Sequence, residues 1–138
     1  MKERVLDTNI ILRFLVGDHP GQFESSKKLI SKIEQREETV FLPLPCACEV
    51  IFTLHRFYRI PREEISGKCS ALFSLPGLHI PSKVTFLRAL ELFAARNISF
   101  TDAFVAAEMK ERGVDEIYSF DRDFDGMAGI TRLEPETL

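Results

Sequence analysis

Residues 4–15 read RVLDTNIILRFL, a short apolar run that ends in an acid and continues directly into a second apolar run. We expect a buried strand over residues 4–7, followed by a helix from Thr8 whose apolar positions nearly surround it. A strand that feeds a helix is typical of α/β folds, in which ligands bind beyond the carboxyl ends of the strands. Asp7 occupies that position, so this stretch predicts an α/β fold with a polar site after its first strand.

The rest of the chain keeps alternating between the two patterns. Strands are expected at residues 39–42, 78–81, 116–120 and 130–133, and helices at 22–37, 46–59, 62–75, 82–96 and 99–110. Strands separated by helices form parallel sheets with helices on both faces. We therefore predict a three-layer α/β/α sandwich around a mostly parallel sheet of four to five strands, built as a single domain over residues 1–138.

Composition narrows the class of protein. A chain of 138 residues with 45% hydrophobic and 28% charged content is long and apolar enough for one globular core. No apolar run approaches the roughly 20 residues of a membrane helix, and no signal peptide precedes the first strand, so a cytosolic protein without a membrane partner is expected. The cysteines and histidines lack the spacing of a zinc site, and the three cysteines are expected to be buried thiols.

The net charge of −3 argues at first against a nucleic-acid partner, which favours clustered positive charge. Setting aside four acids as metal ligands changes the balance to +1, and bound divalent ions add further positive charge. Weak acidity is thus compatible with RNA as the substrate.

Four acids stand where strands end or helices begin: Asp7, Glu49, Asp102 and Asp121. Each alone is equally well explained as a helix cap or turn residue. Together at one sheet edge they would repel one another and raise their own pKa values unless cations neutralised them. Carboxylates without Cys or His favour Mg²⁺ or Mn²⁺, which predicts metal-dependent hydrolysis of a phosphodiester, with these four residues as catalytic and metal-binding groups.

Three nearby residues are candidates for supporting roles. Asn9 and Ser119 can orient carboxylates through hydrogen bonds, although Asn9 is equally explained as a helix cap. Asp123 is a reserve metal ligand, because it lies two residues after Asp121. Asp125 precedes a glycine and is read as a turn residue.

Three arginines are candidates for weak contacts with substrate phosphates. Arg56 follows Glu49 by seven residues, about two helical turns, so the two share a helix face. Arg13 and Arg122 lie close in sequence to acids of the predicted site. Each is also explained as an ordinary solvated surface charge.

Four motifs in this order carry a family resemblance: LDTN at residues 6–9, Glu49 within a helix, FTDA at 100–103 and SFDRDF at 119–124. The chain resembles a PIN domain and, more narrowly, the VapC-type toxin ribonucleases of toxin–antitoxin pairs. The resemblance implies an α/β/α sandwich, a Mg²⁺- or Mn²⁺-dependent endoribonuclease, frequent homodimers, and a small antitoxin whose tail covers the active site. It also implies Asp7, Glu49, Asp102 and Asp121 as an acidic quartet, with Asn9 and Ser119 in support. Ser119 stands where the family commonly has Thr, and the hydroxyl is retained.

Two other functions fit parts of the pattern. A non-catalytic receiver-like or interaction module also binds Mg²⁺ at strand ends, but it requires a lysine after a late strand, where this chain has Asp121 and Leu133. A DNA-directed nuclease of related fold usually carries extra helices for threading DNA, for which this chain is short. RNA cleavage is the favoured interpretation.

Overall fold

The computed structural model describes residues 3–136. Its strands are β1 (Arg4–Val5), β2 (Val40–Phe41), β3 (Leu78–His79), β4 (Glu116–Tyr118) and β5 (Thr131–Leu133). Its helices are α1 (Thr8–Val16), α2 (Pro20–Glu34), α3 (Leu44–Arg56), α4 (Arg62–Phe73), α5 (Lys83–Ala95) and α6 (Phe100–Arg112), with the 3₁₀ helix η1 (Arg122–Gly126). The predicted alternation of strands and helices, and with it the α/β class, is confirmed. The strands are shorter than expected.

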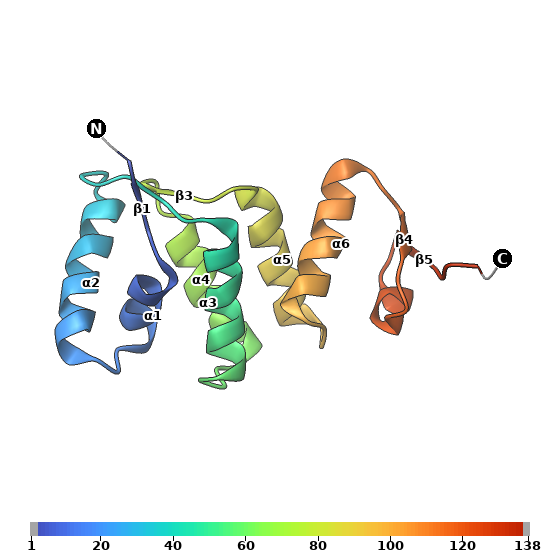
Figure 1. Cartoon of the computed structure of the whole chain (residues 1–138), viewed down its shortest axis with the longest axis horizontal. Helices are drawn as coiled ribbons and strands as arrows, with labels where there is room; N and C mark the ends of the chain where they lie inside the picture. Colours follow the sequence, from blue (N-terminus) through green and yellow to red (C-terminus); the bar gives the residue numbers. More distant parts are fainter. Residues whose placement is uncertain (1–2, 137–138) are drawn as a thin grey trace.

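All strand pairs are parallel, as predicted. β1, β2 and β3 pair in that order, with Val5 beside Phe41 and Phe41 beside His79. β4 pairs with β5, and Ile117 lies beside Arg132. The single sheet expected from the sequence is instead divided into sheets of three and two strands. Figure 1 shows the two sheets near opposite ends of an elongated molecule, with α3 to α6 between them.

The division follows from the path of the chain after α6. Gly113 ends this helix in the left-handed conformation, with φ of 68°, and only Val114 and Asp115 separate it from β4. That turn carries β4 and β5 to the side of α6 that faces away from β1 (Figure 1). β1 is consequently paired on one side only within the described residues.

An aromatic cluster joins α4, α5 and α6. The buried ring of Phe86 lies 5.3 Å from that of Phe73 and 4.9 Å from that of Phe100, and Phe93 lies 5.9 Å from Phe100. Aromatic pairs at these separations add to the stabilisation from buried area. Because Phe100 is the first residue of α6, the cluster fixes the end of the helix that carries Asp102.

Arg62 fixes the turn between α5 and α6. One of its guanidinium nitrogens, Nη1, donates to the carbonyl oxygens of Phe93, Arg96 and Ile98 at 3.1, 3.1 and 2.6 Å. The guanidinium also lies 4.3 Å from the ring centroid of Phe93. These contacts satisfy carbonyls at the end of α5, which a helix leaves without partners.

The structure tests two expectations from composition, which concern the burial of the cysteines and the lack of a membrane-spanning helix. All three cysteines are free, but only Cys69 is buried, whereas Cys46 and Cys48 are half-buried. Cys46 and Cys48 lie in the first turns of α3, where one side of the helix reaches solvent. None of the helices in residues 3–136 has the length and apolar character needed to cross a bilayer.

Candidate metal centre

Three carboxylates converge at the start of α6 and the end of β4. Asp102, Asp121 and Asp123 each offer an oxygen, and these oxygens all lie within 4.8 Å of one another. Asp102 belongs to the first turn of α6, while Asp121 and Asp123 flank the start of η1. Two segments distant in sequence therefore form one acidic cluster.

Short-range hydrogen bonds hold each acid in place. Ser99 caps α6, and its Oγ accepts from the Asp102 backbone N–H at 3.1 Å. Ser119 Oγ accepts from the Asp121 N–H at 3.0 Å, and the Asp121 carboxylate accepts from the Asp123 N–H at 2.9 Å. The supporting role predicted for Ser119 stays a prediction. Its hydroxyl orients the backbone of Asp121 rather than the carboxylate directly.

The environment makes Asp102 difficult to ionise. Its pKa is raised to about 6, first because burial removes water from the carboxylate. A hydrogen bond shared with Asp121 and the negative charge of Asp121 raise the pKa further, and Asp123 adds a smaller effect in the same direction. Ser99 opposes these effects by hydrogen bonding. A site with uncompensated negative charge and only oxygen donors fits a hard divalent cation such as Mg²⁺ or Mn²⁺.

Asp7 and Glu49 lie outside this cluster. Asp7 caps α1 at the end of β1, and its carboxylate accepts from the Thr8 N–H at 2.8 Å. Cys46 Sγ at the start of α3 lies 3.9 Å from the same oxygen, and Glu49 is exposed one turn further along α3. The expectation that all four acids meet at one edge of one sheet is not met within a single chain, because β1 and β4 belong to different sheets.

Thr8 and Asn9, the two residues that follow Asp7, differ in their exposure to solvent. Thr8 is buried, and its hydroxyl donates to the Cys46 carbonyl at 3.4 Å, which ties α1 to α3. Asn9 is exposed in the first turn of α1. The predicted supporting role of Asn9 stays a prediction.

The motifs, their order and this geometry agree with a comparison against known families, in which the model of the PIN domain matches residues 4–130. The chain belongs to the PIN domain family. It is similar to a VapC ribonuclease of Aquifex aeolicus (strain VF5), with 26% identity over 132 residues that cover 96% of each chain. It is also similar to Ribonuclease VapC13 of Mycobacterium tuberculosis (strain ATCC 25618 / H37Rv), with 27% identity over 133 residues, 94% of this chain and 98% of the relative.

A cavity of about 170 Å³ lies beside the acidic cluster of this PIN domain, and Asp123 forms part of its wall. The opposite wall comes from α3, where the Arg56 guanidinium lies 4.7 Å from the ring centroid of the half-exposed Phe52. His55 packs edge-on against Phe93 with ring centroids 5.1 Å apart. Its pKa is lowered by burial and then by the charges of Arg62 and Arg56. Positive charge and aromatic rings therefore adjoin the acids.

The sequence prediction for this region was partial. Arg56 is a weak candidate for a phosphate contact in the sequence analysis, while Phe52 and His55 are not singled out there. The signal was present in residues 52–62, FTLHRFYRIPR, where basic and aromatic residues alternate as they do in nucleic-acid sites.

The remaining candidates lie further from the cluster or are already paired. Arg13 Nε donates to Gln22 at 2.7 Å, and its Nη1 lies 3.8 Å from Asp18. Arg122 is exposed beside the acids at the start of η1. Asp125, read from sequence as a turn residue, accepts from Arg132 Nε at 2.8 Å, which gives it a structural role.

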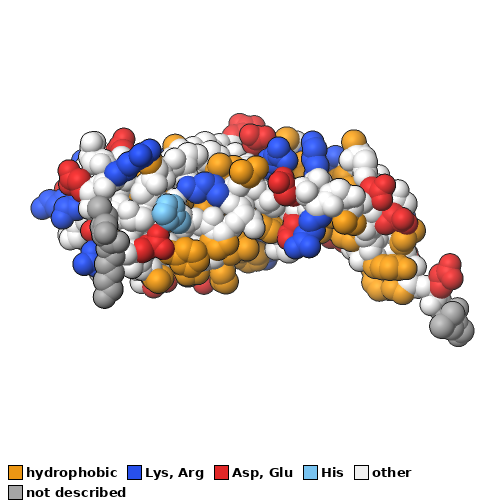
Figure 2. All heavy atoms as spheres, turned by 90° about the horizontal axis from the view of Figure 1, so that it is seen from above, with side chains coloured by type: hydrophobic (Ala, Val, Ile, Leu, Met, Phe, Trp, Pro, Cys, Tyr) orange, Lys and Arg blue, Asp and Glu red, His pale blue; other side chains and the backbone are white. Residues whose placement is uncertain are grey.

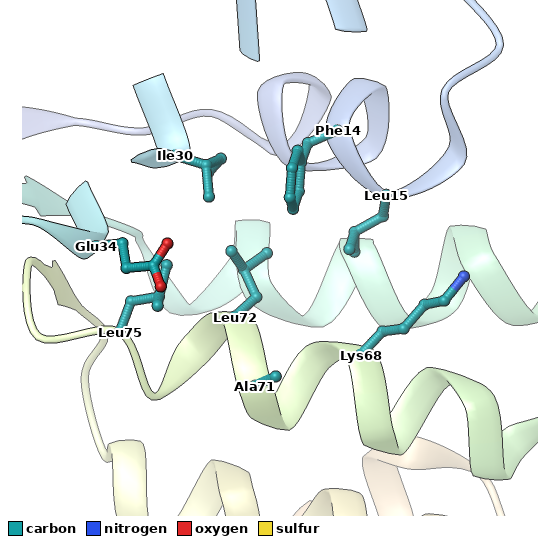
Figure 3. Close-up of a pocket in the computed structure, with 8 residues that line it drawn as sticks. All are labelled: Phe14, Leu15, Ile30, Glu34, Lys68, Ala71, Leu72 and Leu75. Atoms are coloured by element: carbon teal, nitrogen blue, oxygen red, sulfur yellow. The ribbon is translucent and has the colours of Figure 1, made fainter. Parts of the chain in front are cut away.

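A larger apolar groove of this PIN domain lies on other elements. It has a volume of about 410 Å³ between α1, α2 and α4, and Figure 3 shows Phe14, Ile30 and Leu72 pointing into it. Glu34 and Lys68 are the charged residues that line it. None of the acids of the metal cluster borders this groove, so it is separate from the candidate metal centre.

Proposed function

We propose that this PIN domain is a metal-dependent endoribonuclease that acts as the toxin of a toxin–antitoxin pair. The observation that carries the proposal is the convergence of Asp102, Asp121 and Asp123 at one point, together with the raised pKa of Asp102. The names of the related VapC ribonucleases support RNA rather than DNA as the substrate. A small antitoxin is the proposed partner, and the cytosolic location stays a prediction.

In this proposal Asp102, Asp121 and Asp123 hold Mg²⁺ or Mn²⁺. A divalent ion held by these residues would polarise the scissile phosphate and lower the pKa of an attacking water. The chain's own contribution is to hold the backbone of Asp102 and of Asp121 in place, through Ser99 and Ser119. The quartet that the family resemblance implies consists of Asp7, Glu49, Asp102 and Asp121, and we propose that Asp7 and Glu49 act in the same reaction, with Asp123 as an additional ligand.

Substrate contacts are proposed for the cavity beside Asp123. Phe52 offers a ring on which a base can stack, and Arg56 lies over that ring with a charge for the adjoining phosphate. Stacking of a base on an aromatic side chain contributes about 1–3 kcal/mol. Arg13 and Arg122 are weaker candidates, and Arg13 is already engaged by Gln22.

The test is cleavage of a labelled single-stranded RNA with Mg²⁺, with Mn²⁺ and with EDTA. Removal of outer-shell partners of a metal costs about 10–100-fold in activity or affinity, so we expect Asp102→Asn and Asp121→Asn to lose at least about 100-fold. Asp115→Asn is the matched control, because Asp115 is exposed and outside the cluster. Calorimetry should show Mn²⁺ uptake by the wild type and the control only. EDTA-resistant cleavage, or full activity in Asp102→Asn, contradicts the proposal.

The antitoxin is tested through the gene neighbourhood. A small reading frame overlapping upstream should encode a protein that co-purifies with this chain when both are expressed, and that suppresses RNA cleavage. An upstream protein that binds without inhibiting cleavage contradicts the toxin–antitoxin role and leaves the nuclease assignment in place.

A further inference from the structure

Arg62 lines the cavity of about 170 Å³ beside the acidic cluster, and one edge of its guanidinium group is unused. The other edge is engaged, because Nη1 donates to three backbone carbonyl oxygens, those of Phe93, Arg96 and Ile98. Nε and Nη2 have no acceptor within residues 3–136, and neither is sealed from solvent. Their N–H groups lie side by side in the rigid guanidinium plane, so they form a fork of two parallel donors.

Arg62 also lacks the acid that accompanies other arginines of the chain. Arg88 and Arg112 each lie 3.1 Å from a glutamate, and Figure 2 shows basic and acidic side chains next to one another over one face of the molecule. Arg62 forms no ion pair with any described residue, and burial lowers its pKa because water is removed from the charged group. Arg56, on the same cavity, likewise has no acid partner in that part of the chain. Unpaired positive charge in a partly enclosed cavity favours a ligand with acceptor atoms.

The other walls of the cavity suit a nucleobase better than a phosphate group alone. Phe52 and Phe93 give it aromatic surface, which a phosphate cannot use. Asn97 lies at the cavity with an exposed side chain, and its amide has no partner among the described residues. That amide offers a carbonyl acceptor and an NH₂ donor. Aromatic faces combined with polar groups at the edge are typical of pockets for unpaired RNA bases.

The free edge of Arg62 is complementary to guanine. Guanine carries two neighbouring acceptors, O6 and N7, and a bidentate pair with arginine is the commonest specific contact to them. On the corresponding edge adenine has an amino donor in place of O6, cytosine has an amino donor, and uracil has no N7. The N1–H and N2–H donors of guanine lie on the next edge, where the carbonyl oxygen of Asn97 is a suitable acceptor.

The cavity lies at a fixed place relative to the acidic cluster. Asp123 borders the cavity, and its carboxylate belongs to the cluster. Arg96 Nη1 donates to the Gly126 carbonyl at 2.7 Å, which ties the turn that carries Asn97 to η1. A base in the cavity therefore belongs to a nucleotide beside the phosphate that the acids face.

We propose that this cavity is a guanine pocket, which selects the nucleotide next to the scissile phosphate. The fork of Arg62 donates to O6 and N7, and Asn97 contacts the N1–H and N2–H edge. The inference rests on the proposed function, which supplies the scissile phosphate, and it adds the base that the site selects.

The first test changes the RNA and leaves the protein as it is. Cleavage sites mapped in a random-sequence RNA with Mn²⁺ should have guanosine at one position next to the cut. Adenosine, cytidine or uridine at that position should lower the cleavage rate by about 5- to 150-fold. 7-Deazaguanosine, which lacks the N7 acceptor, should lower the rate about tenfold. Equal cleavage of all four bases, preference for another base, or full cleavage of the 7-deazaguanosine RNA overturns the inference.

The second test changes the two residues that contact the base. Arg62→Lys keeps the charge and removes the fork, so it should no longer distinguish guanosine from 7-deazaguanosine. Asn97→Ala should keep that distinction and lose the preference for guanosine over inosine, which lacks the N2 amino group. Each preference is a ratio of rates for one protein sample, so a smaller folded fraction does not change it. Arg88→Lys is the matched control and should keep both preferences, because Arg88 does not line the cavity.

RNA binding without cleavage separates this inference from the proposed function. Fluorescence anisotropy in EDTA compares short labelled RNAs that contain guanosine or 7-deazaguanosine. Tighter binding of the guanosine RNA, lost in Arg62→Lys, in a protein that cuts no RNA with either metal leaves the guanine pocket standing and removes the nuclease. Metal-dependent cleavage without a base preference leaves the nuclease standing and removes the pocket.

Discussion

Asp102 shows how single residues determine the character of the site. Its place in the first turn of α6 is favourable for a carboxylate, because backbone N–H groups and the helix dipole favour negative charge there. Partial burial and the neighbouring Asp121 have a larger opposing effect, since the pKa rises to about 6. The first turn of α6 is therefore a favourable place for an acid. The burial of Asp102 and the charge of Asp121 are what a bound cation would offset.

His55 provides a pH-dependent prediction at the same scale. Its pKa is lowered in the folded protein, by burial and then by Arg62 and Arg56. Below the ordinary histidine pKa of about 6.5, the unfolded chain binds a proton that the folded chain resists, so the free energy of unfolding falls as the pH drops through this range. The raised pKa of Asp102 has the opposite effect on stability in the same range, so the wild type is compared with His55→Gln. Urea unfolding at pH 7.5 and at pH 5 should show a less favourable change in the free energy of unfolding for the wild type than for His55→Gln. Parallel profiles for the two proteins contradict the assignment.

At the scale of elements, the junction between α4 and β3 depends on a close approach of backbones. A Cβ on Gly77 would lie 2.6 Å from the carbonyl oxygens of both Ile33 and Glu38. The Gly77 carbonyl also accepts from the Val40 N–H at 2.8 Å, which begins the pairing of β2 with β3. Gly77 lies just after the helix expected at residues 62–75, and the absence of a side chain there lets the end of α2 approach the three-stranded sheet.

Gly77→Ala should therefore be destabilising. The two carbonyl oxygens belong to backbone, which cannot move aside as a side-chain tip can, and overpacking of this kind costs about 1–3 kcal/mol. Gly67→Ala is the control, because a Cβ at that position in α4 meets nothing within 4 Å and should gain up to about 1 kcal/mol of helix propensity. Urea unfolding of the two variants measures the difference, and equal stabilities would show that the junction opens without cost.

At the scale of the whole molecule, the described chain is extended and its two sheets are incomplete. β1 to β3 and α1 to α2 lie at one end, and β4 and β5 lie at the other (Figure 1). The core is continuous through α3 to α6, where Leu54, Phe86 and Phe93 are buried.

The family resemblance implies a homodimer, and the stability of a homodimer depends on protein concentration. Association of folded chains stabilises them by mass action, so the Tm should rise when the protein concentration is raised a hundredfold. Differential scanning calorimetry measures the shift, and a Tm that does not move with concentration contradicts the homodimer.

Much of the fold was predictable from short stretches of sequence. The positions of the helices and strands follow from local periodicity, and the capping of α6 by Ser99 follows from residues three apart. The grouping of Asp121 with Asp123 is also local, because one turn joins them. The half-burial of Cys46 and Cys48 was missed, since it depends on which side of α3 the neighbouring elements leave open.

The sequence by itself determined the type and order of the elements, the family motifs and the identity of the acids. Only the tertiary structure decided which acids meet. Each strand has two edges that can pair, and the sequence pattern of a strand does not specify which other strand pairs with either edge. Asp102 joins Asp121 through the packing of α6 against α5, while Asp7 stays with β1 in the other sheet. The separation of Asp7 from Asp121 is thus a consequence of the turn at Gly113, which places β4 beyond the reach of β1.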